Sequence, residues 1–150
     1  TALIGSPILG LTGDGPANDL IEVPKELSEL EKKPIYLHNL RQLMVHKPES
    51  ADELALTIHI ENMAKARLRS RGIARTLVLA DSLKNLPCSL HCLFGKQDMT
   101  LHPDLDGIEK YVRDIHPGAS FEIVEDAGHW VQFEAPERVN AILSRILTEN

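Results

Sequence analysis

The second half of the sequence alternates short apolar runs with amphipathic segments, and this alternation limits the fold more than any other feature. Cys88–Phe94 and Phe121–Val124 are short apolar runs of the kind that form central strands. Residues 105–115 and the segment that begins at Pro136 carry apolar residues at helical spacing. Strand, helix, strand, helix in this order predicts parallel strands joined by right-handed crossovers, which is an α/β fold.

The first half of the sequence has a different character. Residues 2–9 form an apolar run followed by glycines, which predicts a buried strand. Residues 16–86 are polar and rich in helix formers, and helices are predicted over 24–33, 35–46 and 51–70. The chain therefore divides into a core strand and turn at 1–15, a helical insertion at 16–86 and the strand and helix region at 87–150.

Local signals support the longest helix of the insertion. Ser50 and Glu53 have the spacing of a capping box, in which the hydroxyl and the carboxylate each take a free backbone amide of the first turn. An apolar stripe near helical spacing follows and predicts the buried face of this helix. The stripe consists of Leu54, Ile58, Met63 and Leu68.

Composition narrows the class of protein and its partners. Of the 150 residues, 43% are hydrophobic and 25% are charged, which is typical of a folded domain and excludes a disordered or collagenous chain. The formal charge of −6 leaves no general basic surface for nucleic acid. No stretch approaches the roughly 20 apolar residues that span a bilayer, and the start lacks the pattern of a secretory signal. We therefore expect a cytoplasmic protein with neither nucleic acid nor membrane as partner.

The two cysteines, Cys88 and Cys92, are predicted to be free thiols. Four residues of strand advance the chain by about 13 Å, whereas a disulfide needs Cα atoms within about 7 Å. The pair also falls short of a zinc signature, although His91 lies between them. We expect no metal and no cofactor.

Polar residues with catalytic potential follow two neighbouring strands. Asp98 comes shortly after the strand that ends at Phe94, and His129 comes shortly after the strand that ends at Val124. In an open parallel sheet, catalytic groups gather beyond the carboxyl ends of the strands. A carboxylate beside an imidazole fixes the tautomer of the histidine and stabilises its protonated form. The sequence therefore predicts an acid–base pair of Asp98 and His129.

At these residues the sequence resembles the α/β-hydrolase family. The resemblance rests on G-x-x-D at residues 95–98, on Gly128-His129-Trp130 and on the run from Trp130 to Asn140 that leads into the last helix. It implies a partial α/β-hydrolase fold, with the last three parallel strands and a helical cap at 16–86. In that family the triad runs nucleophile, acid, histidine along the chain. Asp98 and His129 match the second and third members.

The first member of that triad has no counterpart in this sequence. A nucleophile elbow reads G-x-S-x-G, and no serine here has glycine two places away on both sides. The family order places the elbow before Thr1, and the oxyanion-hole loop also belongs to the earlier half. The chain therefore looks like the C-terminal half of a hydrolase, and we expect it to be inactive alone.

Further residues are candidates with competing interpretations. Asp126 lies near His129 and competes as the acid, but the family pattern favours Asp98. Trp130 either packs beneath the site or contacts substrate. Within the basic part of the cap, Arg67 and then Arg71 are candidates to hold a substrate carboxylate, although a solvated helix face is the plainer interpretation.

The leading functional hypothesis is a serine-type hydrolase acting on a small organic substrate at an ester or C–C bond. Residues 38–44 and 66–71 look like the subgroup that hydrolyses ring-cleavage products. Epoxide hydrolases and dehalogenases share the same ending but use an upstream aspartate as nucleophile. A free Thr1 acting as an N-terminal nucleophile is a further enzyme hypothesis.

The non-enzyme hypothesis is a truncated binding or association module. A half sheet exposes a strand edge, so either interpretation implies a companion chain with the missing half or a homo-oligomer. The first strand is expected to lie beside Cys88–Phe94, with Phe121–Val124 on the far side.

Overall fold

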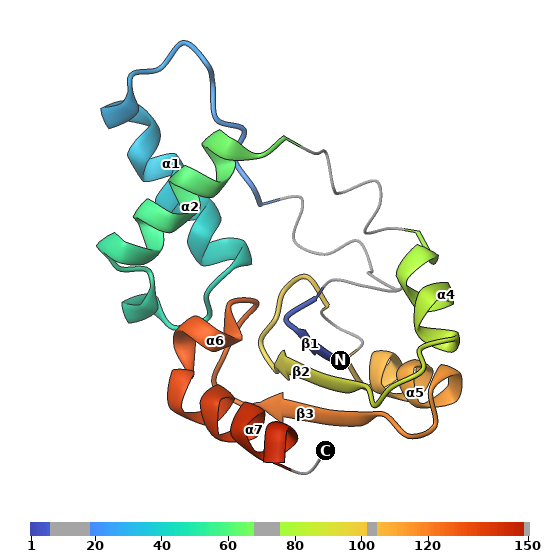
Figure 1. Ribbon diagram of the computed structural model, residues 1–150. Coiled ribbons are helices and arrows are strands. Elements are labelled where there is room, and N and C mark those ends of the chain that lie inside the picture. Colours follow the sequence, from blue (N-terminus) through green and yellow to red (C-terminus); the bar gives the residue numbers. More distant parts are fainter. Residues whose placement is uncertain (7–18, 68–75, 102–104, 149–150) are drawn as a thin grey trace.

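In the computed structural model, which describes residues 1–6, 19–67, 76–101 and 105–148, three strands form one parallel sheet (Figure 1). The strand order is β1, β2, β3, so β2 is central. This order confirms the predicted parallel arrangement, with the first strand on one side of the central strand and the last on the other. The strands are β1 (Ala2–Ile4), β2 (His91–Gly95) and β3 (Ser120–Val124).

Two strands differ in length from the prediction. β2 begins at His91 rather than Cys88, because the ladder starts where both neighbours begin, with Ala2 and Ser120 opposite His91. β1 ends at Ile4, and the next residue, Gly5, turns the chain with a φ of +52°. Residues 7–9 of the predicted first strand lie outside the described residues.

Helices cover both faces of the sheet (Figure 1). Because side chains alternate along a strand, Cys92 and Phe94 pack on one face with α4 and α5, while Leu93 packs on the other with α6 and α7. β2 is thus buried on both faces, as its continuous apolar run predicts. The helices are α4 (Val78–Lys84), α5 (Leu105–Ile115), α6 (Val131–Glu134) and α7 (Pro136–Thr148).

A helical pair lies on the side of the sheet toward which the strands run (Figure 1). It consists of α1 (Glu29–Leu43) and α2 (Glu53–Lys65), joined through a short 3-10 helix, η1 (Pro48–Ser50). Leu40 of α1 and Leu56 of α2 are fully or almost fully buried between them. Within the described residues, no helix is both long and apolar enough to cross a bilayer.

The predicted boundary within the first helix is wrong. The segments 24–33 and 35–46 were expected as separate helices, but α1 is continuous through Pro34. A proline inside a helix removes one backbone hydrogen bond, and here the helix continues past it. Its start is fixed by a capping box that the sequence analysis missed: Ser28 accepts from the Glu31 amide, and the Glu31 carboxylate accepts from the Ser28 amide.

The predicted cap of the second helix is also wrong. Ser50 belongs to η1, and the helix is capped by Asp52, which accepts a hydrogen bond of 2.8 Å from the Ala55 amide. The Glu53 carboxylate instead pairs with the Lys33 ammonium group of α1 at 2.8 Å. Because the helix begins at Glu53, the residue directly before it, Asp52, takes the capping position.

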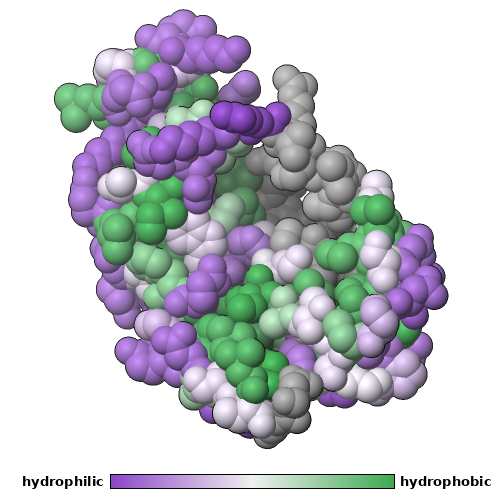
Figure 2. All heavy atoms as spheres, viewed as in Figure 1, coloured by the Kyte–Doolittle hydropathy of each residue, from purple (hydrophilic) through white to green (hydrophobic). Residues whose placement is uncertain are grey.

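The predicted apolar stripe of α2 does not form its buried face. Leu54 is 60% exposed and Met63 is 52% exposed, while Ala55, Leu56 and His59 are the buried residues of this helix. Ala55 and Leu56 are both buried in the cluster that contains Leu40 of α1, so the face of the helix that carries them makes the contact and Leu54 lies at the surface. Leu68 lies outside the described residues. Apolar residues reach the surface over the helical pair and again over α7 (Figure 2).

Candidate active site

Asp98 lies in the turn that follows β2 and is almost completely buried, with 2% of its surface exposed. One carboxylate oxygen, Oδ1, accepts hydrogen bonds from the backbone amide of Thr100 at 2.8 Å and from its hydroxyl at 2.7 Å. These two donors compensate the cost of burying a carboxylate and fix its plane. Asp98 is therefore held rigidly, with its second oxygen left for another partner.

That partner is His129, in the turn after β3. His129 Nδ1 lies 3.0 Å from Asp98 Oδ2 and 3.3 Å from the hydroxyl of Thr100. The imidazole is 15% exposed while the carboxylate is 1% exposed, so the carboxylate is the more deeply buried of the two groups. The expected approach of these two residues to hydrogen-bonding distance is confirmed. With Nδ1 donating to the carboxylate, Nε2 is the nitrogen that can accept a proton.

The two turns meet because Gly95 has no side chain. A Cβ atom at Gly95 would lie 2.2 Å from the carbonyl oxygens of Ala127 and of Gly128. The Gln97 amide donates to the Ala127 carbonyl at 3.0 Å, and the Lys96 amide donates to the Val124 carbonyl at 2.9 Å. The glycine of the G-x-x-D pattern is thus what allows the acid turn to approach the histidine turn.

β1 also ends at this site. Gly5 donates its amide hydrogen to the Leu93 carbonyl at 3.0 Å, and its backbone runs close to the carbonyl of His129. A Cβ atom at Gly5 would lie 2.4 Å from that oxygen. The carboxyl ends of all three strands therefore converge on His129, as expected for a site at the end of a parallel sheet.

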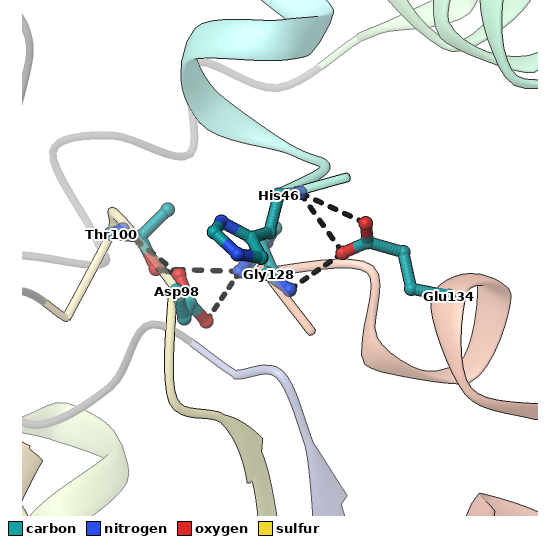
Figure 3. A network of polar contacts seen from close by, with 6 residues as sticks. His46, Asp98, Thr100, Gly128 and Glu134 are labelled. Atoms are coloured by element: carbon teal, nitrogen blue, oxygen red, sulfur yellow. Dashed lines mark hydrogen bonds and ion pairs between the residues drawn. The ribbon is translucent and has the colours of Figure 1, made fainter. Parts of the chain in front are cut away.

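The histidine turn is joined to the segment that follows α1. The amide of Trp130 donates to the carbonyl of Met44 at 2.8 Å. The carboxylate of Glu134, at the end of α6, accepts hydrogen bonds from the amides of Gly128, His46 and Lys47 (Figure 3). Neither Glu134 nor Thr100 was predicted from the sequence. Thr100 had a usable signal, since an aspartate side chain commonly accepts a hydrogen bond from the backbone amide two residues on.

A hollow of about 170 Å³ opens beside this junction. Gln97 and Met99, on either side of Asp98, line it together with Arg41 of α1 and His46 of the segment that follows α1. Its volume lies below the usual range of small-molecule pockets. It shows that the helical pair and the acid turn share a surface next to Asp98.

The remaining candidates fall in different places. Asp126 is exposed, and Asp98 is the carboxylate that is hydrogen-bonded to His129, so the geometry favours Asp98 over Asp126. Trp130 is half-buried and packs against the helical pair, with its ring centroid 6.3 Å from that of His59. Arg67 is exposed beyond the end of α2, and among the described residues no contact joins it to Asp98 or His129. Arg71 lies outside the described residues.

Cys88 and Cys92 are free, as predicted, with Cys88 exposed and Cys92 buried. Burial raises the pKa of the Cys92 thiol to about 11. In the part of the chain that the structure describes, no group of three or more His, Cys, Asp or Glu side chains is placed to hold a metal.

No family model matches the sequence, and neither does any curated protein. Solved structures do match. A protein from Burkholderia cenocepacia described as an aryl esterase superposes with a TM-score of 0.62 at 25% identity, over 82% of this chain and 44% of its own. The carboxylesterase CesB from Bacillus subtilis gives 0.59 at 17% identity, over 99% of this chain and 51% of its own.

A third match is a variant of the meta-cleavage product hydrolase CumD from Pseudomonas fluorescens IP01. Its TM-score is 0.58 at 18% identity, over 99% of this chain and 55% of its own. The chain thus spans about half the length of the solved structures that it matches. These likenesses confirm the fold expected from the sequence.

Proposed function

We propose that this chain, which has a partial α/β-hydrolase fold, supplies the acid and the base of a serine-type hydrolase active site. Asp98 orients and stabilises His129, and His129 is the general base. The substrate is a small organic molecule cleaved at an ester or C–C bond. The observation that carries the proposal is the 3.0 Å contact between His129 Nδ1 and the buried Asp98 carboxylate, formed by turns after adjacent strands.

The geometry suits one cycle of proton transfer. Nε2 of His129 takes the proton of a serine hydroxyl while the oxygen attacks the substrate carbonyl, and the resulting imidazolium is stabilised by Asp98. The same proton then passes from Nε2 to the leaving group. In the second half of the cycle, Nε2 takes a proton from water while the water oxygen attacks the acyl-enzyme. The proton then passes to the serine oxygen, so the acid product is released and the serine is restored.

The serine is proposed to come from a segment outside this sequence. No G-x-S-x-G pattern occurs in the chain. Within the described residues, β1 is an edge strand whose outer side has no strand partner. Unpaired strand edges are ready templates for pairing. A strand of the missing half, placed beside β1, would put its own carboxyl end next to Gly5 and His129.

The helical pair is proposed as the cap that closes over the substrate. α4 lies within the predicted cap range 16–86 but packs on the sheet beside Phe94, so it belongs to the core instead. Arg67 and Arg71 are the proposed ligands for a substrate carboxylate, because a guanidinium group can bind both carboxylate oxygens. The names of the matched proteins include esterases and a C–C hydrolase, and both reactions use a polarised carbonyl. An upstream aspartate, as in epoxide hydrolases or dehalogenases, is the alternative nucleophile.

The test is reconstitution. The purified chain is combined with a polypeptide that carries a G-x-S-x-G elbow, either a co-purified companion or the N-terminal half of one of the matched esterases, and hydrolysis of a p-nitrophenyl ester is measured. The chain alone should stay at background, because it offers no nucleophile and no oxyanion hole. In the active assembly, Asp98→Asn should lower kcat by roughly 10³–10⁴, and the matched control Asp126→Asn should leave it unchanged.

Two outcomes would overturn this proposal. Turnover by the chain alone that is abolished by His129→Ala would mean that the nucleophile lies within these residues. An active assembly that is indifferent to Asp98→Asn and to His129→Ala would mean that the pair is structural, and would favour the binding module.

A further inference from the structure

Glu134 occupies the junction between the histidine turn and the helical pair, and nothing in the proposed reaction uses it. Val131, in the same short helix, is completely buried against the sheet, so α6 is anchored to the core. Glu134 ends this helix, and its side chain extends away from it toward His46 and Gly128 (Figure 3). Its carboxylate is therefore attached to the sheet side of the molecule.

The carboxylate gathers backbone amides from two segments far apart in the chain. Oε1 accepts from His46 at 2.9 Å and from Lys47 at 2.8 Å, while Oε2 accepts from Gly128 at 2.6 Å and from His46 at 3.0 Å. Hydrogen bonds from amides to an ionised carboxylate are shorter and stronger than neutral ones. One side chain thus satisfies three backbone donors that belong to no helix ladder or strand ladder.

The surrounding space is fitted to this arrangement. A Cβ atom at Gly128 would lie 2.9 Å from the His46 nitrogen and 3.1 Å from Glu134 Oε2. Only a residue without a side chain leaves room for both the carboxylate and the segment after α1. The glycine of the Gly128-His129-Trp130 motif is thus explained by this contact.

The position of these contacts along the chain connects them to the base. Gly128 directly precedes His129, and Trp130 directly follows it and donates to the Met44 carbonyl at 2.8 Å. The backbone on both sides of His129 is therefore tied to residues 44–47. The imidazole itself is tied to the sheet through Asp98.

We propose that Glu134 is a positioning residue, which couples the placement of the helical pair to the orientation of the His129 imidazole. A displacement of residues 46–47 would pull on the Gly128 amide through the carboxylate and would lengthen the contact between His129 and Asp98. The catalytic meaning of this coupling rests on the proposed function, but the coupling itself is a property of the chain alone.

The experiment is NMR on the chain with ¹⁵N-labelled histidine and backbone amides. Glu134→Gln keeps the shape but turns one acceptor oxygen into a donor that faces amide hydrogens. The amides of Gly128, His46 and Lys47 should exchange with solvent about tenfold faster or more. The His129 ring signals should move, and the Nδ1 proton should exchange faster to a similar degree. Glu137→Gln, which removes the same charge from an exposed site in α7, should change none of these signals.

A structural role alone would give a different result. Faster amide exchange in Glu134→Gln with an unchanged His129 ring would overturn the proposal, since the carboxylate would then hold the backbone without reaching the base. If this variant does not fold, the wild-type chain gives the answer. The Gly128 amide and the His129 Nδ1 proton should exchange through one common opening, so their protection factors, each corrected for the intrinsic exchange rate of that type of proton, should agree. Protection factors that differ by more than about tenfold would contradict the coupling.

These measurements require no turnover. An inactive reconstituted assembly with intact coupling would count against the proposed function only. An active assembly without coupling would count against the role of Glu134 only.

Discussion

The edge of the sheet at which the three strands end (the sheet edge) and the helical pair each contain a histidine that is largely shielded from water. The groups that surround these two histidines are of opposite character. His129 is hydrogen-bonded to a buried carboxylate. The backbone amides of the residues before and after it, Gly128 and Trp130, donate hydrogen bonds to Glu134 and to the Met44 carbonyl. His59 of α2 is 5% exposed and lies between the rings of Tyr36 and Trp130, with centroids 6.1 and 6.3 Å away. Loss of solvation lowers the pKa of His59 below its usual value.

The difference separates a polar network from an apolar cage. At the sheet edge, the carboxylate of Asp98 faces the ring nitrogen of His129. In the helical pair, a proton on His59 would have to be accommodated among aromatic and aliphatic side chains. The first environment offers the imidazole a charged partner, and the second favours an imidazole that stays neutral.

The largest expected effect concerns the close approach of the two turns at the sheet edge. Gly95→Ala should lower the free energy of unfolding by about 1–3 kcal/mol, because the methyl group would overlap the carbonyl oxygens of Ala127 and Gly128. It should also separate Asp98 from His129 and weaken the low-field signal of the Nδ1 proton. Urea denaturation and NMR of the same sample measure both effects.

Gly118→Ala is the matched control, because a Cβ atom at Gly118 has nothing within 4 Å. It should change stability by less than about 0.5 kcal/mol and leave the His129 signal in place. Equal losses in the two variants would mean that the turns are not packed as closely as the strand ends indicate.

The next prediction concerns His59 and the apolar cage that the rings of Tyr36 and Trp130 form around it. Since the pKa of His59 is lowered in the native state, the unfolded chain takes up a proton first as the pH falls below about 6.5, and the native state loses stability. His59→Phe should remove this part of the acid-induced loss while keeping a ring between Tyr36 and Trp130. Unfolding free energies measured by urea from pH 8 to pH 5 in both proteins give the comparison.

His46→Gln, at an exposed histidine, shows what the loss of any imidazole does to the same profile. An identical pH dependence in the wild type and in His59→Phe would show that the cage accepts a proton readily. The contrast between the two histidines would then disappear.

The sheet edge was the more predictable region because its sequence signals have few structural solutions. The apolar run before Gly95 could form a central strand, and a carboxylate and a histidine after adjacent parallel strands are bound to meet at one edge. Glu134 could not be found in this way. Its partners are backbone amides, which every residue but proline carries and which leave no trace in the sequence.

The helical pair was less predictable because several faces of α2 are apolar. Leu54 and Ile58 define one stripe, whereas Ala55, Leu56 and His59 define another, and only the second packs on α1. Which of the two stripes is buried depends on how closely α1 approaches. The sequence of α2 alone carries no information about that distance. The cap of α2 was open for a related reason, since both Ser50 and Asp52 are capping residue types and the structure uses Asp52.

The smallest effect is expected at the stripe of Leu54 and Ile58, which does not pack on α1. The question is whether another copy of the chain covers this stripe in solution. Leu54 is 60% exposed, so Leu54→Gln, which keeps helix propensity similar, should change the free energy of unfolding by no more than about 0.5 kcal/mol. Urea denaturation at two protein concentrations tenfold apart is the measurement. A loss above about 1.5 kcal/mol that grows with concentration would show that another copy covers this face. In that case Leu54 would be an interface residue, and the apolar stripe expected from the sequence would have its buried surface between chains rather than within one.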